Sequence, residues 1–76
     1  MNQQILINDD FHFNKHLKAW SFTGIYSGNL LTFIISQSEN IQTITQAVKF
    51  DWEAKAEEWF EENELDEETT IYLTHC

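Results

Sequence analysis

The sequence predicts an α+β fold in which an antiparallel β-meander is covered on one face by one long amphipathic acidic helix, in the order β-β-β-α-β. Two patterns support this prediction: apolar residues alternate with a period of two in the first half, and recur every three or four residues later. With 76 residues the chain is too short to build two hydrophobic cores, so we expect one domain over residues 1–76.

Three strands are predicted in the first half of the chain. The run Gln4–Asn8 is rich in Ile and Leu and ends in Asn-Asp-Asp, which is typical of a strand followed by a turn or a helix cap. The runs Lys18–Tyr26 and Leu30–Ser36 flank a Ser-Gly pair and predict a β-hairpin with a two-residue loop. Between the first two strands, a short helical turn around Phe11–Lys15 remains an alternative.

The hairpin register assigns the side chains to two faces. With residues 27 and 28 as the loop, Tyr26 faces Asn29 and the other pairs follow. One face is then a core face, made of Trp20, Phe22, Leu31, Phe33 and Ile35. The other is mixed, with Ala19, Ser21, Thr23, Ile25, Leu30, Thr32, Ile34 and Ser36, and is expected to meet solvent or a partner. A homodimer through its apolar members therefore stays open.

The period changes to that of a helix after Ser38. The apolar positions recur at helical spacing and consist of Ile41, Ile44, Val48, Trp52, Ala56 and Trp59. They predict one continuous helix over about Glu39–Asn63, followed by a last strand at Thr69–Thr74. The opposite arc of this helix is acidic and contains Asp51, Glu53, Glu57, Glu58, Glu61 and Glu62.

Charge is concentrated in this helix and in the segment after it. The net charge is −9, and residues 50–68 contain ten of the thirteen acidic residues but one lysine. The chain has no arginine, so direct binding of nucleic-acid phosphates or anionic lipid is not expected. Carboxylates at i and i+4 repel each other, whereas a face used only for solubility would more easily interleave lysines. Two interpretations of the acidic arc remain: it keeps a small domain soluble and monomeric, or it binds a partner with a basic surface, which the density of like charges favours.

Phe50 falls within the acidic arc on a helical wheel, which leaves two interpretations open. Either a bend of the helix or an adjoining loop covers the ring, or Phe50 is an exposed aromatic anchor ringed by carboxylates, as in many binding hot spots. The predicted partner-binding residues are Phe50, Glu53, Glu57, Glu58 and Glu61.

No residue pattern in the chain strongly indicates catalysis or metal binding. His12 and His16 have the i, i+4 spacing of a metal pair on a helix, but two ligands do not make a site, and a third would have to come from Asp9, Asp10 or His75. The only cysteine is the last residue, and no serine lies in a nucleophile-elbow pattern. We therefore expect no catalysis, no cofactor and no metal. No signal peptide or membrane-spanning stretch is predicted, which indicates a cytoplasmic protein.

The sequence also resembles a known family, the YrdB-like small proteobacterial proteins, a domain of unknown function. The resemblance rests on "MNQ", Ile5, Asp9, Phe13, Lys18, Phe22, Gly28, Leu31, Thr32, Ile35 and Ser36, and then on Asp51, Glu53, Ala56, Glu57 and Leu73 within "DWEAKAEEWFEENELDEETTIYL". It implies a shared fold and no particular activity. Members carry a longer segment before the acidic helix, and its absence here favours one continuous helix.

Together these observations predict a small non-catalytic module that binds a basic protein through its acidic helix. The alternative is an acidic nucleic-acid mimic that occupies the DNA site of a restriction or CRISPR protein, since rows of carboxylates can imitate phosphates. A mimic must compete with DNA for one protein, whereas an adaptor need not.

Overall fold

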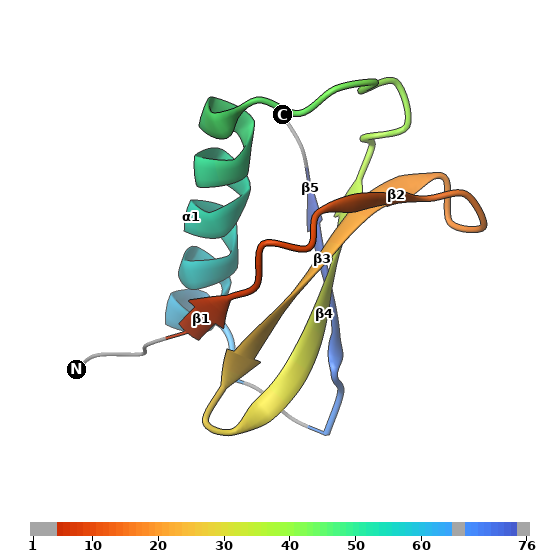
Figure 1. The fold of residues 1–76 in the computed structure, drawn as a ribbon. Coiled ribbons are helices and arrows are strands. Elements are labelled where there is room, and N and C mark those ends of the chain that lie inside the picture. The colour runs from red at the N-terminus through yellow and green to blue at the C-terminus, as the bar shows by residue number, and fades with distance from the viewer. Residues whose placement is uncertain (1–4, 65–66, 75–76) are drawn as a thin grey trace.

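The computed structural model of the protein describes residues 5–64 and 67–74. It has five strands and one helix: β1 (Ile5–Ile7), β2 (His12–Asn14), β3 (Ala19–Tyr26), β4 (Asn29–Ser36), α1 (Gln46–Glu62) and β5 (Thr70–Thr74). The strands form one sheet in the order β1-β3-β4-β5, with β2 also paired to β3. In Figure 1 α1 runs along one side of this sheet, and no described element covers the other side. The predicted α+β fold is confirmed.

The central hairpin has the predicted register. Tyr26 pairs with Asn29, and the antiparallel ladder continues to Trp20 opposite Ile35. Ser27 and Gly28 both have positive φ, 53° and 80°, as a two-residue turn that matches the twist of the strands requires. The alternation of side chains is therefore fixed along both long strands, and the core face and the opposite face fall where the sequence placed them.

The first edge of the sheet is one strand interrupted by a short insertion. Ile7 pairs with Gly24 and His12 pairs with Ser21, so residues 8–11 span only two residues of β3. Because of the insertion, no strand backbone among the described residues accepts a hydrogen bond from the Thr23 N–H. The Asp10 carboxylate accepts it instead, at 2.9 Å, and also accepts a hydrogen bond from the Thr23 hydroxyl at 2.5 Å. The alternative of a helical turn around Phe11–Lys15 is wrong, because β2 continues the pairing with β3.

Strand β5 is the one exception to antiparallel pairing. It lies parallel to β4, with Phe33 opposite Ile71 and Ile35 opposite Leu73. The chain leaves one end of β4, and α1 carries it back along the sheet to the other end, so β5 must run in the same direction as β4. Such a β-α-β crossover buries its helix against the sheet, which is where α1 lies in Figure 1.

The helix begins at Gln46, seven residues later than predicted. The side chain of Thr45 caps it by accepting a hydrogen bond from the Val48 N–H at 3.3 Å. Ser38, expected near the helix start, is instead fully buried, where its hydroxyl donates to the Ile35 carbonyl and accepts from the Trp20 N–H. At the other end the prediction holds, because Asn63 caps the helix through bonds to the Trp59 carbonyl.

One hydrophobic core lies between α1 and the sheet. Its fully buried side chains come from both layers and include Phe22, Leu31, Phe33, Ile35, Trp52 and Ala56. Aromatic rings join the layers: Phe11, from the insertion between β1 and β2, lies 4.6 Å from Phe22 and 6.2 Å from Trp52 between ring centroids. The insertion therefore directs one large ring into the core, and α1 is held with its opposite face outward.

Candidate functional site

The acidic surface consists of Phe50, Glu53, Glu57, Glu58 and Glu61 on the outer side of α1. Glu53 is half-buried, and the other four side chains are exposed. The inner side of the same helix buries Trp52, Ala56 and Phe60. Because successive residues of a helix are about 100° apart, this burial fixes the direction of the carboxylates. The structure thus brings all five predicted residues onto one helix, on the side away from the core.

The carboxylates of the acidic surface lie in the middle and at the C-terminal end of the helix, and Glu61, in the last turn, is the least favourably placed. The first turn of α1 has no acidic residue and the last turn has no basic one, and every residue of this helix is described. Glu57, Glu58 and Glu61 all fall in the second half, toward the partial negative charge of the helix C-terminus. Like charges at i and i+4 add repulsion between Glu53 and Glu57 and between Glu57 and Glu61. Helix stability therefore does not account for this arrangement.

The two lysines of α1 do not neutralise the acidic surface. Lys49 forms an ion pair with Asp9 at 3.2 Å and lies 5.4 Å from the centroid of the Phe11 ring. Lys55 pairs with Asp51 at 3.8 Å, one turn back along the helix. Among residues 5–64 and 67–74, no ion pair engages the four carboxylates of the acidic surface. Their charge is thus presented to solvent.

Phe50 is exposed, and its exposed fraction is 59%. Neither a bend of α1 nor a neighbouring loop covers the ring, so the interpretation of a covered Phe50 is wrong. The ring lies one turn before the first glutamate of the acidic surface. It offers an apolar contact beside a row of carboxylates, a combination suited to a partner that carries both basic and apolar side chains.

The two histidines do not form the helical pair that their spacing suggested. His12 lies on β2, where its Nδ1 is 3.0 Å from the Asp10 carbonyl oxygen. His16 lies in the following turn, and its N–H donates to the Asn14 side chain. Within the part of the chain that the structure describes, no three His, Cys, Asp or Glu side chains are grouped as a metal ion would require. His75 lies outside the described residues.

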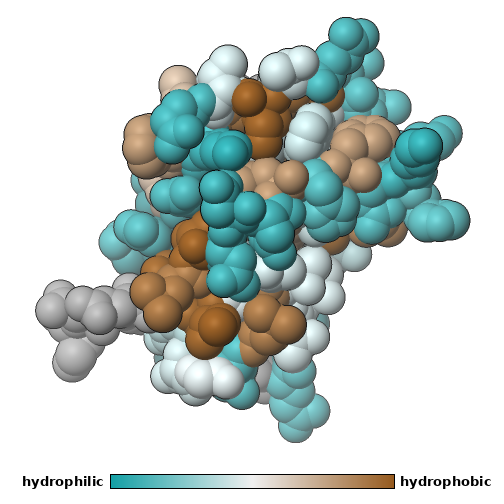
Figure 2. Space-filling model, viewed as in Figure 1, coloured by the Kyte–Doolittle hydropathy of each residue, from teal (hydrophilic) through white to brown (hydrophobic). Residues whose placement is uncertain are grey.

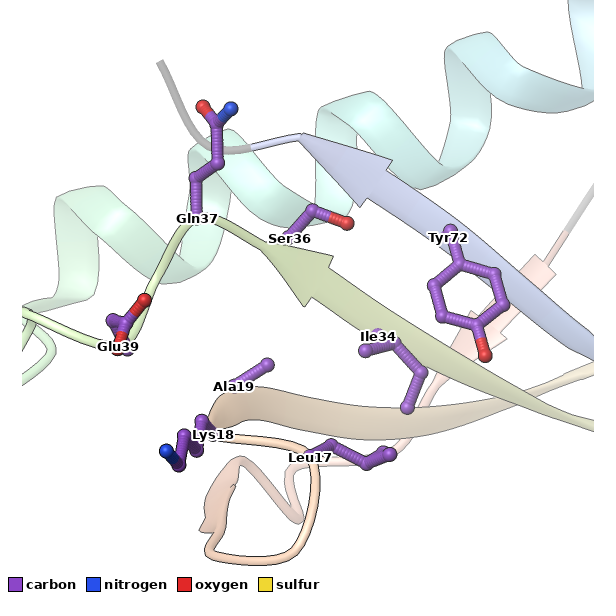
Figure 3. A pocket seen from close by; sticks show the side chains of 8 residues that line it. All are labelled: Leu17, Lys18, Ala19, Ile34, Ser36, Gln37, Glu39 and Tyr72. Atoms are coloured by element: carbon purple, nitrogen blue, oxygen red, sulfur yellow. The ribbon is translucent and has the colours of Figure 1, made fainter.

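A second surface feature, which the sequence did not single out, is a hollow on the open face of the sheet. We use "open face" for the side of the sheet opposite α1. The hollow has a volume of about 350 Å³ and is lined by Leu17, Lys18, Ala19, Ile34, Ser36, Gln37, Glu39 and Tyr72 (Figure 3). The buried side chains of Ala19 and Ile34 form its apolar floor. Leu17 and Tyr72 form its sides, with exposed fractions of 48% and 63%.

Part of this hollow could have been found in the sequence. In "TIYLT" the alternation that buries Ile71 and Leu73 places Tyr72 on the open face. Leu17 gave no such signal, because a single apolar residue in a polar turn has no period. Its position depends on Asn14, whose side-chain oxygen accepts hydrogen bonds from the N–H groups of His16 and Leu17 and so folds the turn over the sheet edge.

The fold and these two surfaces define a small α+β domain with an acidic helix on one side and an open sheet on the other. No protein-family model matches the chain, and none of the curated proteins does. The structure is similar to the crystal structure of a protein of unknown function from the DUF1488 family of Shewanella loihica PV-4. That likeness has 27% sequence identity and a TM-score of 0.69, and it covers 96% of this chain and 94% of the other.

This likeness supports one part of the family resemblance that the sequence indicated, and leaves the other part unsupported. The similar structure belongs to an uncharacterised domain family of a proteobacterium, as the sequence resemblance implied, but the YrdB-like name is not supported. No activity is attached to that structure. In the described residues, moreover, no helix combines the length and apolar character that crossing a bilayer requires.

Proposed function

We propose that the protein is a non-catalytic binding module whose acidic surface docks onto a basic surface of another protein. The observation that carries this proposal is the grouping of Glu57, Glu58 and Glu61, which repel neighbouring carboxylates and meet no cation among the described residues, with Glu61 also in the last turn of α1. A partner that supplies lysines or arginines would remove that cost on binding.

Electrostatic attraction and the exposed ring are expected to act on different steps. Complementary fields accelerate the encounter and are screened over a Debye length of about 8 Å at physiological salt, so the carboxylates should govern the association rate. Phe50 would instead be buried on docking, and loss of such an anchor mainly speeds dissociation. The two contributions can therefore be separated by kinetics.

The test compares two variants of equal charge. In the first, Glu53, Glu57, Glu58 and Glu61 are replaced by Gln, and we refer to it as the four-Gln variant. In the control, four acidic residues outside α1 are replaced by Gln, namely Glu39, Glu64, Glu67 and Glu68, all of them exposed. Each substitution removes one negative charge, so both variants go from −9 to −5. Proteins captured from a cognate lysate by the wild type are purified and their binding rates measured at several salt concentrations.

The proposal requires that the four-Gln variant binds the captured partner more slowly and with a flatter salt dependence, while the control keeps most of the wild-type rate. Phe50→Ala should change mainly the dissociation rate. Equal rates and salt slopes for the four-Gln variant and the control would mean that net charge alone attracts the partner. The acidic surface would then be only a solvated helix face.

The spacing of the carboxylates supports a second candidate, mimicry of nucleic acid. From Asp51 to Glu62 six carboxylates lie on a helical stretch of roughly 18 Å at 1.5 Å per residue, or about one charge every 3 Å. A single DNA strand carries about one phosphate every 3.4 Å along the axis. If the captured partner binds DNA, and duplex DNA and this protein exclude each other on it, the mimic is favoured. Simultaneous binding favours the adaptor.

A further inference from the structure

The open face of the sheet carries most of the large apolar side chains that the described residues leave exposed. Seven such side chains are exposed, and five of them belong to this face or border it: Leu6, Leu17, Ile25, Leu30 and Tyr72. Figure 2 shows hydrophobic residues gathered on the surface around β1. Exposed large apolar side chains gathered on one face of a small protein commonly mark an interaction site.

We infer that two copies of this chain associate through their open faces, with both acidic helices turned outward. The uncharged side chains of the open face favour a second copy of the chain as its partner. The open-face side chains of β3, β4 and β5 are uncharged. Charged or titratable residues lie around this face: Asp10, His12, Lys18, Glu39, Glu67 and Glu68. A second copy offers the same neutral apolar face, whereas its remaining surface contains the charge that would repel the first copy.

Distance weakens the repulsion between the two acidic helices, each of which has a net charge of −4 from six carboxylates and two lysines. Packed sheets lie about 10 Å apart, and each helix axis lies roughly another 10 Å beyond its own sheet. The two acidic helices would therefore be about 30 Å apart, several times the Debye length of about 8 Å at physiological salt. Any other face-to-face pairing brings at least one helix nearer to the partner.

The open face is also complementary in shape to itself when the second copy is reversed. Leu6, Ile25 and Leu30 form an exposed apolar row at one end, since they lie opposite one another in the sheet. The hollow bounded by Leu17 and Tyr72 lies at the other end. A twofold axis that lies between the two sheets and perpendicular to their strands places the apolar row of each copy over the hollow of the other. The same contact then forms twice.

The area available fits a weak dimer. Strands β3 and β4 have eight residues each, β5 has five, and β1 and β2 have three each, so at about 4.8 Å between strands and about 3.4 Å per residue the face presents on the order of 450 Å² per copy, or about 900 Å² in total. That is slightly below the size of ordinary specific interfaces and fits a weak, transient one, so we expect dissociation in the high micromolar range. Because the contact is apolar and the copies carry like charge, raising the salt concentration should strengthen it, opposite to the effect expected for binding of a basic partner.

The test is analytical ultracentrifugation of the wild type with two matched variants, Leu30→Lys and Phe50→Lys. Both side chains are 59% exposed, and both substitutions add the same charge, but Leu30 lies on the open face and Phe50 on α1. We expect Leu30→Lys to weaken the dimer at least about a hundredfold, since the change occurs twice per dimer, and Phe50→Lys to leave it unchanged. Circular dichroism checks that both variants are folded.

A cross-linking arm tests the reversed orientation. In a Cys76→Ser background, the double variant Leu30→Cys with Ser36→Cys should be joined between copies by a bis-maleimide spanning about 10 Å, whereas Leu30→Cys alone should be joined poorly. The inference is overturned by a wild type that is monomeric at several hundred micromolar, by an unchanged Leu30→Lys dimer, or by loss of the dimer in Phe50→Lys. Efficient joining through position 30 alone would overturn the reversed arrangement.

Discussion

Removing the carboxylates of the acidic surface should make the protein more stable. The four-Gln variant loses the like-charge pairs Glu53–Glu57 and Glu57–Glu61 and one partner of Glu58–Glu62, each pair being worth a few tenths of a kcal/mol. It also removes Glu61 from the last turn of α1, where the helix dipole adds a few tenths more. After screening at exposed positions, the sum is about 1 kcal/mol in the free energy of unfolding, or roughly 4–8 °C in Tm for a domain of this size.

The assay is urea denaturation, which leaves ionic strength unchanged, at low salt and at about 0.5 M NaCl. The difference between the four-Gln variant and the wild type should shrink at high salt. The control variant with Gln at 39, 64, 67 and 68 should gain less, because those residues lie outside α1. An equal gain in both variants would attribute the effect to net charge. A four-Gln variant less stable than the wild type would refute the reasoning that these carboxylates oppose helix stability.

Three further substitutions test how the fold holds α1 and the interrupted edge. Trp52→Ala empties a fully buried site at the centre of the core and should cost about 3–5 kcal/mol in urea melts, close to the whole stability of a small domain. Thr45→Ala removes the helix cap and should cost about 1 kcal/mol, whereas Thr45→Gly should cost only a few tenths. Asp10→Ala leaves the Thr23 N–H without its acceptor and should cost about 1–3 kcal/mol, with faster hydrogen exchange at that amide, while Asp10→Asn should retain part of the stability.

The long strands and the outward side of the helix could be predicted because each depends on a local period. In the hairpin, one turn and strict alternation determine every pair from Trp20 to Ile35. In α1, the spacing of Trp52 and Ala56 determines which side is buried. The same wheel placed Phe50 on the outer side of the helix, but the sequence could not show whether another segment covers the ring.

The sequence placed the start of the helix too early because an irregular segment that packs on the core can show the same spacing of apolar residues as a helix. Ile41 and Ile44 continue the helical period, yet they precede Gln46 and pack against the core from an irregular connection. That connection is held by tertiary bonds, including the one from the Trp20 indole N–H to the Ile41 carbonyl at 2.8 Å. The run from Ile41 to Thr45 is also rich in β-branched residues, which are weak helix formers.

Two features depended on contacts between distant residues and gave no local pattern. Strand β2 exists because β3 offers it a free edge after the insertion of residues 8–11, and three residues are too few to show a period. The direction of β5 depends on the length and path of α1, which returns the chain to the start of β4. In both cases the partner strand determines the structure.

The two proposed binding surfaces, the acidic surface on α1 and the open face, lie on opposite sides of the same sheet. Burial of Trp52 and Ala56 turns the carboxylates of α1 outward, and the same sheet alternation that buries Phe33 and Ile35 turns Leu30 to the open face. A change at Leu30 therefore lies across the sheet from the acidic surface, and the four-Gln change lies across it from the open face. Because the two sets of substitutions act on opposite layers, loss of self-association with retained partner binding, or the reverse, would assign each function to its own face.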